Sequence, residues 1–135
     1  MKINITDTTT IRELQEAFRI SYPYLTIKFF DKPHAWGEGS SSAHCYDPLF
    51  RVQSIEKKKQ APGFFEVFPW QKVGEVERNF QEQLGLYAQI CRKHGEGWIE
   101  TAGTDELSLD EQNELGKKTL INTHENLWIE RELWF

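Results

Sequence analysis

The fold is decided by the stretch INITDTTTIRELQEAF at residues 3–18, which recurs 62 positions later in a related form, FEVFPWQKVGEVERNF at residues 65–80. Each stretch begins with alternating apolar residues, which are typical of a strand. It continues with apolar residues at the spacing of an amphipathic helix. The matching positions are Ile3, Ile5, Ile11, Glu13, Leu14 and Phe18 in the first copy, and Phe65, Val67, Val73, Glu75, Val76 and Phe80 in the second. We therefore predict an internal repeat, at about residues 2–30 and 64–92.

Capping residues set the expected bounds of the first two helices. Thr10 followed by Glu13 fits a capping box, so the first helix is expected over about residues 11–20. The second helix is expected over about residues 71–84, and Gly85 is well placed as its C-terminal cap because glycine tolerates the left-handed conformation. Both helices should direct their apolar face into one core.

A third helix, short and polar, is expected after the second repeat unit. Ser108 and Glu111 form another capping-box pattern at its start, and Gly116 is expected to end it. Acidic residues are frequent between residues 105 and 114. Capping and the helix dipole explain them, so we interpret them as a solvated helix face.

Further strands are predicted after each helix, at about residues 25–29 and 86–90, with one more at 98–101. The resulting order is β-α-β-β-α-β, then a strand, a helix and an apolar tail. We predict an α+β fold with a mainly antiparallel sheet and helices packed on one face. The order is that of a ferredoxin-like unit with an extra strand, a short helix and an apolar tail.

The whole chain, residues 1–135, is expected to form a single domain, since one core commonly serves a chain of this length. Residues 31–62 lose the apolar periodicity and are interpreted as a loop insertion. Within this insertion a short strand is expected near Phe50 and Val52. The insertion holds too little apolar mass to form a domain of its own.

Part of the C-terminal half is similar to a family of small bacterial proteins without a known activity. The resemblance rests on Trp98-Ile99-Glu100-Thr101, with Thr104-Asp105 and Glu111-Gln112-Asn113. It covers a minor part of the chain and implies no functional residue.

Composition excludes several function classes. The net charge is −5 and the pI is about 5.4, which opposes binding to phosphate backbones, so no nucleic-acid partner is expected. The N-terminus lacks the apolar core of a secretion signal, and no apolar run approaches the ~20 residues of a membrane span. The two cysteines are therefore expected to be free thiols. We expect a soluble, cytoplasmic protein with no membrane partner.

A metal site is the first chemical candidate, because imidazole and thiolate groups bind zinc. His34, His44 and Cys45 lie in the loop at residues 31–50, but their spacing is irregular and a structural site needs four ligands. Ordinary polar loop residues explain the pattern more simply. A nucleophilic Cys45 activated by His44 is disfavoured, since neighbours on an extended chain point to opposite faces. A small-ligand or zinc-binding protein, or an enzyme, that uses this loop is kept as the alternative hypothesis.

The C-terminal tail is the second candidate because it is rich in large apolar side chains, which must be covered by the sheet or by a partner. Its candidate interaction residues are Trp128, Ile129, Leu133, Trp134 and Phe135. No convincing catalytic residue, phosphate loop or basic face is present, and no cofactor is expected. We therefore interpret the protein as a non-catalytic interaction or regulatory module. It is expected to bind itself or another protein through the tail or an exposed sheet edge.

Overall fold

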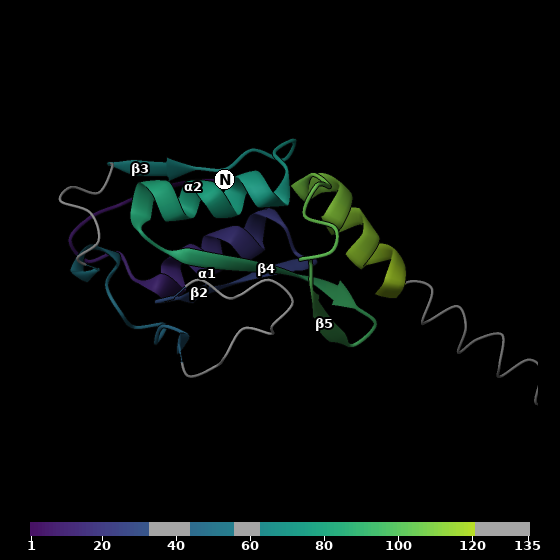
Figure 1. Ribbon diagram of the computed structural model, residues 1–135, viewed down its shortest axis with the longest axis horizontal. Helices are drawn as coiled ribbons and strands as arrows, with labels where there is room; N and C mark the ends of the chain where they lie inside the picture. The colour runs from purple at the N-terminus through teal and green to yellow at the C-terminus, as the bar shows by residue number, and fades with distance from the viewer. Residues whose placement is uncertain (33–43, 56–62, 121–135) are drawn as a thin grey trace, which may run out of the picture.

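The computed structural model describes residues 1–32, 44–55 and 63–120, which form an α+β fold as predicted (Figure 1). A strand–helix–strand unit occurs twice along the chain. The elements are β1 (Lys2–Asn4), α1 (Ile11–Ser21), β2 (Leu25–Phe30), the 3-10 helix η2 (Val52–Ser54), β3 (Phe64–Glu66), α2 (Val73–Leu84), β4 (Tyr87–His94) and β5 (Gly97–Glu100). A third helix follows over residues 109–120.

The described strands form two antiparallel sheets, where one was expected. β1 pairs with β3, and β4 lies between β2 and β5. The registers place Ile3 opposite Phe65, which is 62 positions later, and Ile27 opposite Ile90, which is 63 positions later. Each strand of the first unit thus pairs with the corresponding strand of the second. The ferredoxin-like detail and the internal repeat stay predictions.

The core lies between the helices and the sheets. α1 packs mainly against β2, and α2 mainly against β4 (Figure 1). The predicted apolar faces are the buried ones, with Ile11, Leu14 and Phe18 on α1 and Val73, Val76, Phe80 and Leu84 on α2. The Phe80 ring joins the two sheets: its centroid is 4.2 Å from that of Phe65 on β3 and 5.0 Å from that of Phe29 on β2.

Three predicted helix caps are confirmed. The Glu13 N–H donates to Thr10 Oγ1 at 3.3 Å. At the third helix, the Glu111 N–H donates to Ser108 Oγ at 3.1 Å, and the Ser108 N–H donates to Glu111 Oε1 at 3.3 Å. Gly85 ends α2 with a positive φ of 69°, which glycine adopts without steric cost.

Gly116 was expected to end the third helix, and this prediction is wrong. The helix continues through residue 116 to residue 120. A Cβ at position 116 would lie only 2.9 Å from the Tyr24 carbonyl oxygen and 3.2 Å from Arg92 Cγ. Glycine is therefore needed here so that the helix can approach the chain just before β2.

The short strand expected near Phe50 and Val52 is also wrong, because η2 forms there. The Ile55 N–H donates to the Val52 carbonyl at 3.2 Å, and both side chains are buried. A period of three residues brings these two side chains to the same side of the chain, whereas strand alternation would separate them. The backbone of Arg51 forms an isolated β-bridge with Thr10.

No helix in the described ranges is both long enough and apolar enough to cross a membrane.

Candidate functional site

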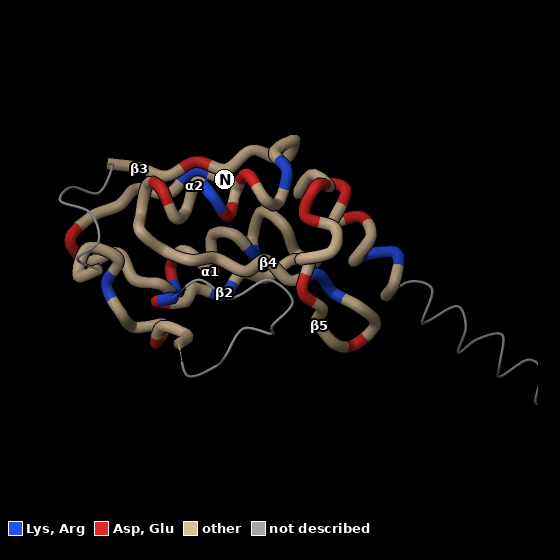
Figure 2. Tube along the Cα trace, viewed as in Figure 1, with Lys and Arg blue, Asp and Glu red and all other residues tan. Residues whose placement is uncertain are grey.

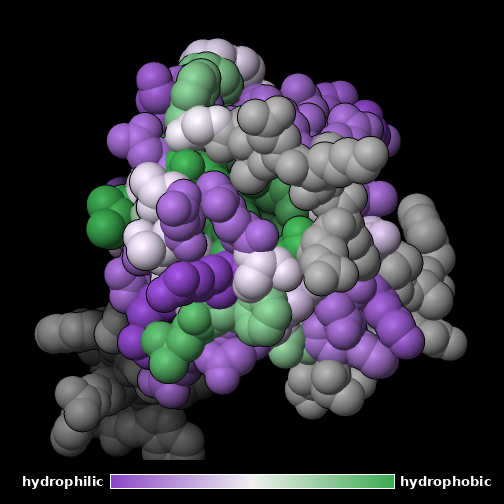
Figure 3. Space-filling model, turned by 90° about the vertical axis from the view of Figure 1, so that its left-hand side faces the viewer, coloured by the Kyte–Doolittle hydropathy of each residue, from purple (hydrophilic) through white to green (hydrophobic). Residues whose placement is uncertain are grey.

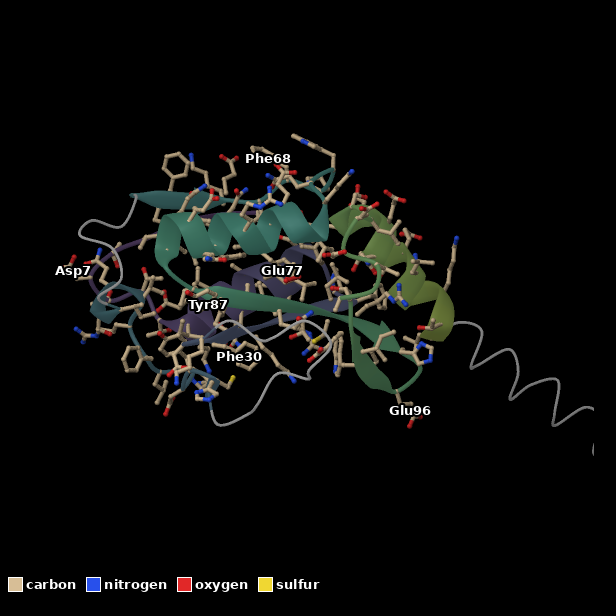
Figure 4. All side chains as sticks on the ribbon, in the orientation of Figure 1. Asp7, Phe30, Phe68, Glu77, Tyr87 and Glu96 are labelled. Atoms are coloured by element: carbon tan, nitrogen blue, oxygen red, sulfur yellow. The ribbon has the colours of Figure 1, made fainter. Side chains whose placement is uncertain are left out.

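An aromatic strip lies on the outer side of β3 and of the turn that follows it. Alternation along the chain directs Phe65 and Val67 into the core, where each is 1% exposed, and directs Phe64 and Phe68 outward. Trp70 is 70% exposed, and its ring stacks on Phe68 with 4.7 Å between the centroids. In Figure 4, Phe68 lies on the side of α2 away from β4. We call Phe64, Phe68 and Trp70 the aromatic strip.

Two opposite charges lie beside Phe64 in the aromatic strip. Lys2 and Glu66 are cross-strand partners in the β1–β3 ladder. The Lys2 ammonium group also lies 4.4 Å from the centroid of the Phe64 ring. Lys2 and Glu66 therefore place one positive and one negative charge at the Phe64 end of the strip, on a protein whose net charge is −5.

The turn that carries the exposed tryptophan is held by hydrogen bonds on two sides. The Phe68 N–H donates to Gln71 Oε1 at 2.8 Å. From the third helix, the Leu109 N–H donates to the Gln71 carbonyl and the Asp110 N–H donates to the Pro69 carbonyl, both at 3.0 Å. These contacts give the indole a defined position although most of its surface is exposed.

Other exposed apolar side chains are separated from the strip. Leu49 and Phe50 are exposed in the segment before η2. Figure 3 views the molecule from the end where η2 lies, and hydrophobic side chains there are interspersed with hydrophilic ones. Ile20, near the end of α1, is 81% exposed. Single exposed apolar residues of this kind are common and imply no function.

The start of α1 is held by a segment that we call the first clamp, residues 47–52. The Ile11 N–H donates to the Phe50 carbonyl at 2.9 Å, and the Arg12 N–H donates to the Pro48 carbonyl at 2.8 Å. The first N–H groups of a helix have no acceptor within the helix itself. The first clamp supplies those acceptors.

The start of α2 is held in the same way by the second clamp, residues 104–110. The Val73 N–H donates to the Leu107 carbonyl at 3.0 Å, and the Gly74 N–H donates to the Asp105 carbonyl at 2.9 Å. The residue before α2 makes no side-chain capping bond, so the clamp carbonyls are the acceptors at this end. Figure 2 shows that acidic residues, coloured red along the trace, are frequent in this clamp and at the start of the third helix.

One polar position on each helix reaches the neighbouring strand, and the two positions differ in charge. Gln15 on α1 and Glu77 on α2 are 62 positions apart. Gln15 Nε2 donates to the Ile27 carbonyl on β2 at 3.0 Å, whereas the Glu77 carboxyl group accepts a hydrogen bond from the Ile90 N–H on β4. In Figure 4, Glu77 lies on the side of α2 that faces β4. The second unit therefore has a titratable group where the first has a neutral amide.

The environment of Glu77 favours its neutral form. Burial is the largest cause that raises its pKa to about 8, and the charge of Asp105 adds to it. The hydrogen bond from Ile90 lowers the pKa, and the charge of Glu100 raises it slightly further. Burial also raises the pKa of the Cys91 thiol, and the charge of Glu77 is a smaller cause in the same direction. At pH 7, Glu77 is therefore mostly protonated.

Sequence reasoning did not single out Glu77, although a signal was present. Residue 77 lies four positions after Val73 and three before Phe80, which places it within the apolar stripe of α2. A partly buried glutamate on this stripe is exposed to a lower dielectric than that of water and to whatever packs on the stripe. The acidic residues near position 105 were interpreted only as a solvated face, but Asp105 acts on Glu77.

The zinc candidates are only partly described. His34 lies outside the described residues. His44 Nδ1 is 3.2 Å from Asp31 Oδ1, while the exposed Cys45 forms an isolated bridge with Phe30. No group of three or more His, Cys, Asp or Glu side chains among the described residues is arranged to hold a metal ion. The zinc hypothesis stays a prediction.

The predicted interaction residues of the tail lie outside the described residues. They are Trp128, Ile129, Leu133, Trp134 and Phe135. Their role in self-association stays a prediction.

Gln112 and Asn113, two residues of the C-terminal stretch singled out from the sequence, hold the third helix to the rest of the fold. Gln112 is fully buried; its Nε2 donates to the Thr104 carbonyl at 2.6 Å, and its Oε1 accepts from Arg92 Nη1 at 2.9 Å. Asn113 Oδ1 accepts from the Tyr24 N–H at 2.9 Å. A buried amide without such partners would destabilise the fold, so these contacts give the stretch a packing role.

Comparison with known proteins identifies no relative. No family model matches the chain, and no similar curated protein or solved structure was found. A function is therefore inferred from the described residues themselves.

Proposed function

We propose that this protein is a non-catalytic interaction module that self-associates through the aromatic strip. The observation that carries the proposal is the stacked pair of Phe68 and Trp70, which presents an indole that is 70% exposed. Tryptophan is prominent among the residues that dominate binding energy at protein interfaces. Because the ring is already stacked and its turn is already held, association orders little further structure.

Charge favours a second copy of the chain as the partner. Lys2 and Glu66 lie on the same outer side as the strip. When two such faces meet about a two-fold axis, Lys2 of each copy can face Glu66 of the other. Because the net charge of −5 makes two copies repel each other overall, a local pair of opposite charges favours the face that carries it. The tail at residues 127–135, an exposed sheet edge and a different protein partner remain the predicted alternatives.

Sedimentation velocity over a range of concentrations tests this proposal. Trp70→Ala should weaken self-association by more than about tenfold, which corresponds to an interface anchor worth more than ~1.4 kcal/mol. Ile20→Ala is the control, because Ile20 is also mostly exposed, at 81% against 70% for Trp70, but lies near the end of α1. A wild-type protein that stays monomeric at all concentrations, or an equal effect of both variants, would refute the aromatic strip.

A charge exchange tests the two-fold arrangement. Lys2→Glu should weaken self-association because it places like charges opposite each other, and Glu66→Lys should do the same. The double variant restores the opposite charges and should recover association. Circular dichroism of each variant checks that the monomer is folded. If the double variant associates no better than the single ones, the two copies do not meet through this pair.

One observation supports the rival hypothesis of a ligand or metal site in the loop at residues 31–50. In many metal sites a carboxylate orients the histidine that binds the metal. Asp31 lies beside His44 Nδ1 in such a position. Zinc should then raise the melting temperature in proportion to the logarithm of its excess, and His44→Ala should abolish that rise. A wild-type melting temperature that does not respond to zinc would exclude this site.

A further inference from the structure

The edge of the three-stranded sheet is formed by β5, whose outer side meets no strand of the described ranges. The strand order is β2-β4-β5, so β5 has β4 on one side only. The Thr101 N–H donates to the Ile90 carbonyl at 3.2 Å, which shows which residues of this segment face β4. Alternation along the strand then directs the backbone N–H and carbonyl of Trp98 to the open side. An edge of this kind is a template for one more strand.

Two cations lie beside the Trp98 ring on one face of this edge. Lys93 is the cross-strand partner of Trp98, and its ammonium nitrogen is 4.9 Å from the centroid of the ring. The guanidinium carbon of Arg19, in the last turn of α1, is 5.0 Å from the same centroid. Lys93 Nζ also donates to the Glu96 carbonyl at 3.0 Å. A carboxylate placed next to this ring would therefore meet two positive charges.

The remaining side chains of β5 set two further requirements for a partner strand. Ile99 is 37% exposed, and alternation places its side chain on the opposite face from those of Trp98 and Glu100. Like charges directly opposite each other destabilise a strand pair. A fitting strand therefore has a carboxylate opposite Trp98, an apolar side chain opposite Ile99 and no carboxylate opposite Glu100.

The residues that follow the third helix contain this pattern. Residues 121–135 lie outside the described ranges. One antiparallel register meets all three requirements, with the cross-strand pairs Trp98–Glu130, Ile99–Ile129 and Glu100–Trp128. A shift to Glu132 opposite Trp98 would place Glu130 against Glu100. A parallel strand with Glu132 opposite Trp98 also avoids repulsion, but parallel pairing is less stable per residue.

The connection is long enough for this register within one chain. Thr119 Oγ1 lies 3.1 Å from the Lys93 carbonyl oxygen and accepts from the Gly95 N–H at 3.4 Å, so the third helix ends beside the β4–β5 turn (Figure 1). The chain must then pass the length of β5, about 13 Å, and residues 121–127 span up to about 23 Å. Its short tether gives this segment a high effective concentration at its own β5, which favours that strand over the β5 of a second copy.

We propose that residues 128–131 add to β5 as a further antiparallel strand of their own chain. The Glu130 carboxylate binds Arg19 and Lys93 beside the Trp98 ring, and the Ile129 side chain covers the exposed Ile99. This inference does not depend on self-association through the aromatic strip, because β3 and β5 belong to different sheets.

Disulfide formation in the full chain tests the register. Ile99→Cys together with Ile129→Cys, in a chain that also carries Cys45→Ser, places two thiols at directly opposed positions, where Cβ atoms are about 4.5–5.5 Å apart. Mild oxidation should join them within one chain, which mass spectrometry detects as a cross-linked monomer. Ile99→Cys with Trp128→Cys is the matched control, because alternation directs these side chains to opposite faces, and it should cross-link much more slowly.

A charge reversal tests the contact with the two cations. The Trp98 amide should be protected from hydrogen exchange in the wild type, because the register gives it an acceptor in the backbone of residue 130. Glu130→Lys brings a third positive charge to Arg19 and Lys93 and should lower this protection about tenfold or more. Glu125→Lys is the matched control, since it makes the same charge change in the connection, and it should leave the protection unchanged.

Four results would overturn the proposal. The first cysteine pair could join two chains instead of one, which would assign the segment to a second copy. Both cysteine pairs could cross-link equally, or neither could cross-link. The Trp98 amide could exchange without protection in the wild type. Finally, the two charge variants could change its protection alike.

Discussion

The starts of α1 and α2 are built alike and stabilised differently. In both, the first two N–H groups of the helix donate to two clamp carbonyls that lie two residues apart in the chain. The acceptors are Phe50 and Pro48 at the start of α1, and Leu107 and Asp105 at the start of α2. The Thr10 side chain adds a local cap to α1, whereas the start of α2 has no side-chain cap. The start of α1 is therefore stabilised by a local side-chain cap together with tertiary contacts, whereas the start of α2 is stabilised by tertiary contacts.

The segments that follow the two clamps also differ. After the first clamp the chain forms the short η2, and after the second it forms the third helix. The Val52 N–H donates to the Thr9 carbonyl at 2.9 Å, and the Leu109 N–H donates to the Gln71 carbonyl at 3.0 Å. Each segment therefore begins with an equivalent hydrogen bond to the chain just before a helix. The third helix then adds polar contacts to the sheet. The second unit is therefore the more elaborate, and it has the titratable Glu77 where the first unit has the neutral Gln15.

The largest expected effect concerns the aromatic residue at the core position of each helix. Phe80→Ala should lower the free energy of unfolding by about 3–5 kcal/mol, and Phe18→Ala by about 1 kcal/mol less. Both rings are fully buried, but Phe80 contacts aromatic rings of both sheets, while the Phe18 ring contacts Tyr22 of its own helix end. Urea unfolding measures both. A larger loss in the free energy of unfolding for Phe18→Ala than for Phe80→Ala would show that the core depends more on the first unit than on the second.

An intermediate effect is expected where the third helix meets the sheet. Gly116→Ala should lower the free energy of unfolding by about 1–3 kcal/mol, because the added methyl group would overlap the Tyr24 carbonyl. Gly103→Ala is the control, since no atom lies within 4 Å of the added Cβ and its φ is not positive. It should change stability by less than about 1 kcal/mol. Equal effects would mean that the third helix can shift away from Tyr24 without loss.

The smallest expected effect separates the two helix caps. Thr10→Ala should lower the free energy of unfolding by about 1 kcal/mol because it removes the bond to the Glu13 N–H. Lys72→Ala, at the corresponding position of α2, should change it by less than about 0.5 kcal/mol. Thermal and urea unfolding of the two variants provide the comparison. A cost for Lys72→Ala as large as that for Thr10→Ala would contradict the view that the second clamp alone caps α2.

The sequence predicted the features that depend on local patterns. Helix faces, the capping pairs at Thr10 and Ser108 and the glycine cap at Gly85 depend on residues a few positions apart. It did not predict that Gly116 is a packing glycine, because the neighbour that excludes a Cβ is Tyr24, far away in the chain. Glu77 was missed for a similar reason: its stripe position was visible, but Asp105 comes from another element.

The sequence by itself determined which residues form two amphipathic helices and their companion strands, because the spacing of apolar side chains fixes which face each element buries. Only the tertiary structure decided how those units meet: Ile3 against Phe65, Ile27 against Ile90, and two clamps against two helix starts. The physical reason is that backbone N–H and carbonyl groups are the same in every residue. Which of them pair over long distances is set by the packing of the whole core.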